Sequence, residues 1–290
     1  MRADRLALLT ETRLHRPGAV AEAAAARKRP DSPVGPSGRC LVIAADHPAR
    51  GALGTGGDPL AMADRADLLD RLCTALDNPG CTGVLGTADI LEDLLLLGAL
   101  DGKTVFGSMN RGGLAGAAWE IDDRFTGMTA DGIARLGFDG GKTLTRIDYG
   151  DPATPAVLEQ TAHAVDALAS RGLIAMVEPF VSTREDGRLV NDLSTEAVIR
   201  SVAVAAGLGT TSARTWLKLP TVPDPARVAA ATTLPVVLLG GEVADLDAQR
   251  DKWSEALEAP NAVGLTVGRS LLYPADGDVA GAVQKVVDLL

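Results

Sequence analysis

Cysteines and aromatic residues are scarce in this chain of 290 residues, of which aromatics make up 3%. Its three cysteines, Cys40, Cys73 and Cys81, are odd in number and form no CxxC pair. Such a set is typical of reduced thiols rather than of a disulfide framework. We therefore expect a cytoplasmic protein whose cysteines are packing residues.

Long hydrophobic runs are also absent, and residues 94–97, for example, are four leucines in a mixed segment. A membrane span needs roughly 20 apolar residues, so the sequence excludes one. The apolar stretch at residues 6–9 is too short for a secretory signal. A net charge of −10 offers no basic face for a nucleic acid. Any anionic ligand must therefore be held in a local pocket.

Histidines are few as well, and His15, His47 and His163 have no spacing that suits a metal ion. The chain also lacks a P-loop, a GxSxG elbow and the kinase motifs. We therefore predict no metal and no cofactor.

Two parts of different composition follow one another along the chain. Residues 1–29 are rich in alanine and arginine and predict a helix. Residues 30–38 contain three prolines and two glycines and predict a linker. We therefore divide the chain into an N-terminal helix with its linker, residues 1–38, and one barrel domain, residues 39–290.

Short apolar runs alternate with segments of helical spacing from Arg39 onward. The eight runs that we predict to be strands are 40–45, 83–86, 104–109, 142–147, 173–177, 215–219, 235–239 and 263–267. Helices are expected between them, for example at 65–76, 155–170, 194–206, 225–231 and 247–257.

Continuously apolar strands indicate a parallel sheet that is covered on both faces. Eight β/α units in about 250 residues match the (β/α)8 TIM barrel, an α/β fold. A doubly wound sheet is the alternative, but no GxGxxG turn follows the first strand. The exposed helices of such a barrel lead us to expect a homo-oligomer.

Functional residues of such a barrel lie at the carboxyl ends of the strands. This rule selects a short set of candidates: Asp46, Asn110, Arg111, Lys142 to Arg146, Glu178, Lys218, Gly240, Gly241, Glu242, Gly268, Arg269 and Ser270.

Lysines are the most informative candidates, because the chain has six among its 28 basic residues. Lys218 lies between bulky apolar residues, where burial would lower its pKa. It could be an amine nucleophile, or a salt-bridged or snorkelling lysine. Lys142 on a second strand favours the nucleophile, since a neighbouring cation disfavours the charged amine. An ion pair of Lys142 with Asp139 or Asp148 is the alternative.

Two carboxylates also end predicted strands. Glu178 follows an apolar run and would be partly desolvated, which suits proton transfer. Asp46 holds the same position on the first strand and could handle protons or pair with a lysine. Each could instead be a cap or a salt bridge.

Glycine turns follow the last two strands. Gly240-Gly241 and Gly268-Arg269 lie where barrels commonly hold a phosphate with backbone N–H groups and an added cation. Glycines also merely make turns, but the arginine adds a fork that suits phosphate. We predict a phosphorylated small-molecule substrate.

Six short motifs together resemble the class I aldolases of the DeoC/LacD group, especially the tagatose-bisphosphate aldolase branch. They are ADHPARGAL at 45–53, KTL at 142–144, VEP at 177–179, LKLP at 217–220, LGG at 239–241 and VGR at 267–269, and they span roughly residues 40–275.

The resemblance implies that Lys218 is the Schiff-base lysine and that Glu178 is an acid/base group. Lys142 and Asp46 would support catalysis. A phosphate clamp would consist of Arg269 with Gly240, Gly241 and Gly268. Arg50 would be a further substrate-binding residue, although His47-Pro48-Ala49 lengthen its link to Asp46 relative to the tagatose enzymes.

The activity that the resemblance implies is metal-independent cleavage of a phosphorylated keto sugar or keto acid to dihydroxyacetone phosphate and an aldehyde. The chain looks most similar to actinobacterial DeoC/LacD-like proteins of inositol breakdown, which implies 2-deoxy-5-keto-gluconate 6-phosphate as the substrate. The alternatives are an imine-free sugar-phosphate isomerase or epimerase and a non-catalytic sugar-phosphate-binding protein.

Overall fold

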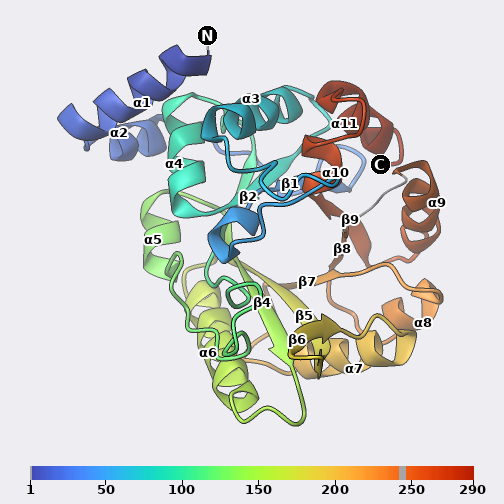
Figure 1. Cartoon of the computed structure of the whole chain (residues 1–290). Helices are drawn as coiled ribbons and strands as arrows, with labels where there is room; N and C mark the ends of the chain where they lie inside the picture. Colours follow the sequence, from blue (N-terminus) through green and yellow to red (C-terminus); the bar gives the residue numbers. More distant parts are fainter. Residues whose placement is uncertain (1, 242–245) are drawn as a thin grey trace.

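The chain forms a closed barrel of eight parallel strands with helices around it, as a computed structural model that describes residues 2–241 and 246–290 shows (Figure 1). Around the ring the order is β1-β2-β3-β4-β5-β7-β8-β9, and β9 pairs with β1. The predicted (β/α)8 TIM barrel is thus confirmed. A closed ring has no sheet edges, so the doubly wound alternative is wrong.

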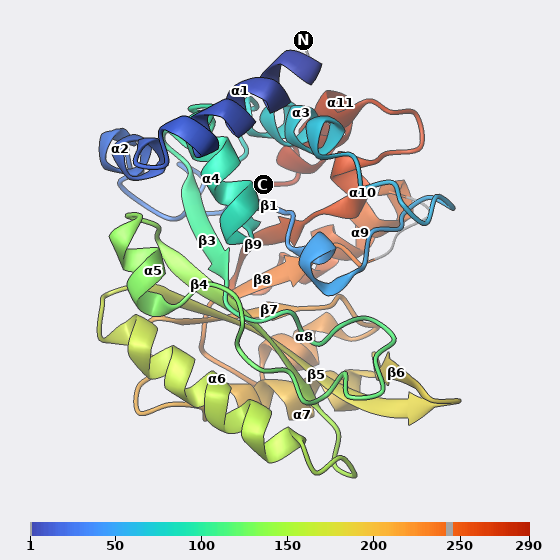
Figure 2. The same cartoon turned by 60° about the vertical axis from the view of Figure 1, so that its left-hand side comes forward.

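The eight predicted strands all form. They are β1 (Cys40–Ala44), β2 (Gly83–Gly86), β3 (Thr104–Ser108), β4 (Gly140–Ile147), β5 (Ile174–Glu185), β7 (Thr215–Leu219), β8 (Val236–Leu239) and β9 (Ala262–Val267). The ninth strand, β6 (Arg188–Asn191), was not predicted; it pairs antiparallel with the far end of β5 and extends away from the barrel (Figure 2). Its turn has positive φ at Asp186 and Gly187, and an Asp-Gly pair is a typical hairpin signal.

Helices cover the outside of the ring. The longer ones are α3 (Arg65–Leu76), α4 (Ala88–Leu96), α5 (Ala130–Arg135), α6 (Thr154–Ala169), α7 (Thr195–Ala206), α8 (Pro225–Ala229), α9 (Leu246–Ala256) and α11 (Val279–Val287). Two short helical turns, η1 (His47–Arg50) and α10 (Arg269–Leu272), follow β1 and β9. Within the described ranges, no helix has the length and apolar character that crossing a bilayer requires.

Side-chain alternation along the strands separates the two parts of the core. Leu41 and Ile43 of β1 face the helices, whereas Val42 belongs to a smaller cluster inside the ring. Phe106 and Trp216 meet inside the barrel with ring centroids 6.2 Å apart. These apolar side chains fill the interior of the ring. The inward-facing residues that follow them along the strands are therefore accessible only from the carboxyl ends of the strands.

The N-terminal segment forms two helices, α1 (Arg2–His15) and α2 (Ala19–Ala26), so the prediction of one continuous helix was wrong. Pro17 and Gly18 separate them, because proline lacks the N–H that a continuing helix needs. α1 packs against α3 and α2 against α4, on the outside of the barrel (Figure 2). Residues 30–38 contain no helix or strand, as the linker prediction requires, whereas the domain boundary at residue 38 stays a prediction.

Arg27 fixes this segment to the barrel. Its side chain is 1% exposed and donates hydrogen bonds to the carbonyl oxygens of Lys103 at 2.8 Å and Gly137 at 2.5 Å.

We predict that Arg27→Met lowers the free energy of unfolding by about 3 kcal/mol, because buried acceptors lose a charged donor. Urea unfolding measures this. Arg16→Met, at a side chain that is 69% exposed, should change it by less than about 0.5 kcal/mol; equal effects would contradict the docking role of Arg27.

Candidate active site

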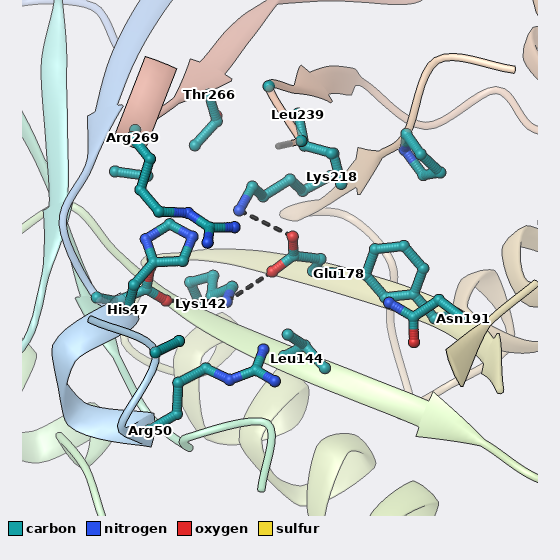
Figure 3. A pocket seen from close by; sticks show the side chains of 18 of the residues that line it. His47, Arg50, Lys142, Leu144, Glu178, Asn191, Lys218, Leu239, Thr266 and Arg269 are labelled. Atoms are coloured by element: carbon teal, nitrogen blue, oxygen red, sulfur yellow. Dashed lines mark hydrogen bonds and ion pairs between the residues drawn. The ribbon is translucent and has the colours of Figure 1, made fainter. Parts of the chain in front are cut away.

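The cavity at the carboxyl ends of the strands is about 430 Å³ in volume and is lined by all nine residues predicted for the site. The set consists of Asp46, Arg50, Lys142, Glu178, Lys218, Gly240, Gly241, Gly268 and Arg269. Strand alternation brings Lys218 and Glu178 together in this cavity. Each follows, two residues later on its strand, a side chain of the inner apolar cluster: Trp216 precedes Lys218, and Met176 precedes Glu178. Figure 3 shows their side chains directed into this cavity.

Glu178 lies between the two lysines. Its Oε1 is 2.9 Å from Nζ of Lys218, and its Oε2 is 2.6 Å from Nζ of Lys142 (Figure 3). Burial alone would raise the pKa of Glu178, but the charges of Lys142 and Lys218 outweigh it and hold the pKa at about 2. The carboxylate is therefore ionised at neutral pH and bridges the two cations.

Lys142 has a second carboxylate partner, Asp46, whose Oδ2 lies 2.9 Å from its Nζ. Burial alone would lower the pKa of Lys142, but Asp46 and Glu178 raise it above its ordinary value. Burial likewise opposes the charge of Asp46, yet Lys142 holds the pKa of that carboxyl well below its usual range. The expected repulsion between Lys142 and Lys218 is therefore replaced by a shared carboxylate, and the ion pair of Lys142 with Asp139 or Asp148 does not form.

His47 is a cavity residue that the sequence reasoning did not select. Its ring lies beside Arg269 (Figure 3), and its Nδ1 is 3.8 Å from Oδ1 of Asp46. Burial, assisted by the charge of Arg269 and opposed by Asp46, lowers the pKa of His47 to about 4, so the ring is neutral at pH 7. The position directly after Asp46, at a strand end, was the signal that could have identified it.

Glycines bring the ends of β8 and β9 close to their neighbours. A Cβ at Gly240 would lie 2.7 Å from Cγ1 of Val267, and one at Gly268 would lie 2.3 Å from the carbonyl oxygen of Ala44. Packing alone therefore requires glycine at both positions. Gly241 has φ +66°, and its turn and Arg269 both line the cavity. The glycines and the Arg269 guanidinium therefore share the end of the cavity beside β8 and β9.

Arg50 is in the cavity but not at this end. Its Nη2 lies 3.3 Å from Oε1 of Glu120, which also accepts a 2.8 Å hydrogen bond from Arg146. Figure 3 shows Arg50 reaching toward Leu144 of β4, away from Arg269. Arg50 thus lies apart from the glycine turns and Arg269, and its role in substrate binding stays a prediction.

The remaining candidates have different outcomes. Asn110 is buried in the wall, where it binds the backbone of Leu144 and the carboxylate of Asp123. Arg111 lines the cavity, whereas Ser270 lies in a neighbouring one. Glu242 falls outside the described residues. In the part of the chain that the structure describes, no three His, Cys, Asp or Glu side chains gather as metal ligands.

Solved structures share this fold. An archaeal fructose 1,6-bisphosphate aldolase is 18% identical, with a TM-score of 0.64 over 93% of this chain and 98% of that one. Fructose-bisphosphate aldolase from Slackia heliotrinireducens is 14% identical, with a TM-score of 0.62 over 87% of this chain and 85% of that one. The chain thus shares the (β/α)8 barrel fold of these two aldolases. The DeoC/LacD group itself stays a prediction.

A family model described as Cgl0159-like matches residues 38–287, and the chain belongs to the Cgl0159-like family. The crystal structure of Cgl0159 from Corynebacterium glutamicum is 50% identical, with a TM-score of 0.96 over 99% of this chain and 96% of that one. No curated protein matches the sequence.

Acid should weaken the fold through the buried carboxylates. The pKa of Glu178 is about 2 in the folded chain against 4.5 ordinarily, so its contribution to stability is present above pH 4.5 and is lost as the pH falls toward 2. We predict that Glu178→Gln removes up to about 1.4 kcal/mol per pH unit from the slope of unfolding free energy between pH 5 and pH 3. Urea unfolding across this range measures the slope, and identical slopes would contradict the charged bridge.

Proposed function

We propose that the protein is a class I aldolase in which Lys218 forms an imine with a phosphorylated ketone. The observation that carries this proposal is the contact of 2.9 Å between Nζ of Lys218 and Oε1 of Glu178 in a buried cavity. An amine nucleophile needs an adjacent group that takes its proton. Glu178 is ionised and in ion-pair contact with Lys218, so it is placed to be that acceptor.

Lys218 suits this role better than Lys142. Two carboxylates contact Lys142, at 2.9 and 2.6 Å, and they raise its pKa. Lys218 contacts one carboxylate, which is shared. Neutralising Lys142 would leave Asp46 and Glu178 with one fewer cation in a buried site, which is costly. Lys142 therefore remains charged and can donate hydrogen bonds to substrate oxygens.

The reaction proceeds through an imine. The neutral Lys218 amine adds to the ketone, and the carbinolamine takes up a proton on its hydroxyl group and loses water to leave a protonated imine. Cleavage of the C–C bond sends its electron pair to the imine nitrogen and gives an enamine, while the hydroxyl proton of the departing carbon passes to a base and an aldehyde leaves. A proton then returns to the enamine carbon. Water finally hydrolyses the imine to the ketone product and free Lys218.

Proton transfers fall to Glu178, directly or through a water, because its two oxygens contact both lysines. Asp46 keeps Lys142 in place from the opposite side. The turns after β8 and β9 with Arg269 would hold the phosphate through backbone N–H groups and a guanidinium.

The finer assignment follows from the sequence motifs. Their resemblance to the DeoC/LacD group supports dihydroxyacetone phosphate as the ketone product. It also suggests 2-deoxy-5-keto-gluconate 6-phosphate as the substrate, a prediction that a cleavage assay with this compound would test. The archaeal fructose 1,6-bisphosphate aldolase with the same fold has its catalytic lysine bound to a carbinolamine intermediate, which is consistent with the proposed chemistry.

Borohydride reduction in the presence of dihydroxyacetone phosphate tests the proposal directly, because it converts an imine into a stable adduct. We predict that peptide mass spectrometry maps the adduct to Lys218 and that Lys218→Met abolishes both the adduct and turnover, with a rate loss above about 10³-fold. The matched control is Lys252→Met, at an exposed helical lysine. No adduct in the wild type would favour the imine-free isomerase or the binding protein.

Glu178→Gln tests the acid/base role of Glu178. Glutamine keeps the shape of the side chain but cannot take a proton, so we predict a fall in kcat of about 10²- to 10⁴-fold. Steady-state kinetics measure this fall in kcat, and circular dichroism checks that the variant is folded. A loss of less than about fivefold would assign proton transfer to another group.

A further inference from the structure

Two arginines, Arg50 and Arg111, line the wall of the cavity opposite the glycine turns, and Arg146, which is not a lining residue, shares a carboxylate with Arg50. Arg146 lies on β4, and Arg111 and Glu120 lie in the segment between β3 and α5. Arg50 reaches this wall from η1 (Figure 3). β4 and β9 are four strands apart in a ring of eight, in either direction, so this wall faces Arg269 across the mouth.

Charge on this wall is only partly compensated. Arg50 and Arg146 share one oxygen of Glu120, at 3.3 and 2.8 Å, and the other oxygen accepts from the N–H of Gly116. Arg146 is 7% exposed, and burial together with repulsion by Arg50 lowers its pKa to about 10. One carboxylate thus serves two guanidinium groups in a desolvated place.

Arg111 adds a further positive charge. Its guanidinium donates to the hydroxyl of Thr126 at 3.0 Å and to the carbonyl oxygen of Ala49 at 2.5 Å, which are both neutral. Asp123 is the other carboxylate near Arg146, and its Oδ2 accepts hydrogen bonds from Asn110 and the N–H of Gly112. Three arginines against two carboxylates leave a net positive charge at the cavity wall.

We propose that this arginine wall, in which Arg50 and Arg111 line the cavity and Arg146 adds a buried charge that shares Glu120 with Arg50, binds an anionic group on the part of the substrate that leaves as the aldehyde. The inference rests on the proposed aldolase function. Lys218 lies on β7, next to β8, so the ketone part with its phosphate occupies the side of the glycine turns. The rest of the substrate then extends toward β4. The aldehyde product consequently carries a phosphate or a carboxylate and is not a neutral aldehyde.

Aldol synthesis from dihydroxyacetone phosphate tests this with two matched pairs of aldehydes. Glyceraldehyde 3-phosphate is compared with glyceraldehyde, and succinate semialdehyde with butanal. We expect kcat/KM to be at least about 100-fold higher for the anionic member of at least one pair. The pair that shows the preference identifies phosphate or carboxylate as the recognised group.

Variants show whether the arginines cause the preference. Arg50→Met should lower the anionic-to-neutral ratio at least about 30-fold, and Glu120→Gln, which frees both guanidinium groups, should raise it. Arg124→Met is the control, because this side chain of the same segment is 73% exposed and paired with Asp122. If Arg50→Met does not fold, Arg111→Met, at an exposed position, should also lower the anionic-to-neutral ratio of kcat/KM.

Two results would overturn the proposal: ratios near one for both pairs in the wild type, or equal losses with anionic and neutral aldehydes in Arg50→Met. The second would mean that the arginines only anchor the segment between β3 and α5. Failure of the aldolase function is recognised separately, by the absence of a borohydride adduct on Lys218. In that event calorimetric binding of the same four aldehydes decides the role of the wall.

Discussion

Buried charge that must be neutralised locally is the constraint on which the centre of this protein depends. Lys218, Glu178, Lys142 and Asp46 form a row in which each oxygen–nitrogen contact is 2.6 to 2.9 Å. Removing Lys142 or Glu178 would leave a charge without its partner in a desolvated place, which is far more costly than losing a surface ion pair. These contacts fix the geometry of the row. Lys142, between two carboxylates, stays charged, whereas Lys218 contacts only Glu178, the carboxylate that both lysines share.

The closed barrel makes this row possible. Neighbouring strands are held in register by backbone hydrogen bonds, and every second side chain points inward. Trp216 and Met176 close the interior below, so Lys218 and Glu178 one inward step above them face the open end. The same alternation carries β4 from Lys142 and Leu144, which line the cavity, to Arg146, whose contact with Glu120 links the reacting centre to the arginine wall along one strand.

Sequence patterns gave the barrel strands and the central residues because both are local. A buried parallel strand is recognisable as a continuous apolar run, and a lysine or glutamate within such a run is conspicuous. The break at Pro17 and the hairpin turn at Asp186-Gly187 were also readable but were overlooked. His47 was missed because its importance depends on Arg269 and Asp46, of which Arg269 is more than 200 residues away in the chain.

The sequence by itself determined the fold class, the order of the strands and which polar side chains end them, since each depends on periodicity within a few residues. Only the tertiary structure decided how those side chains pair. Glu178 contacts two lysines from different strands, and Arg50 joins Glu120 and Arg146 rather than Arg269. Closure of the ring brings these residues together, and no local pattern records which charge will face which across its mouth.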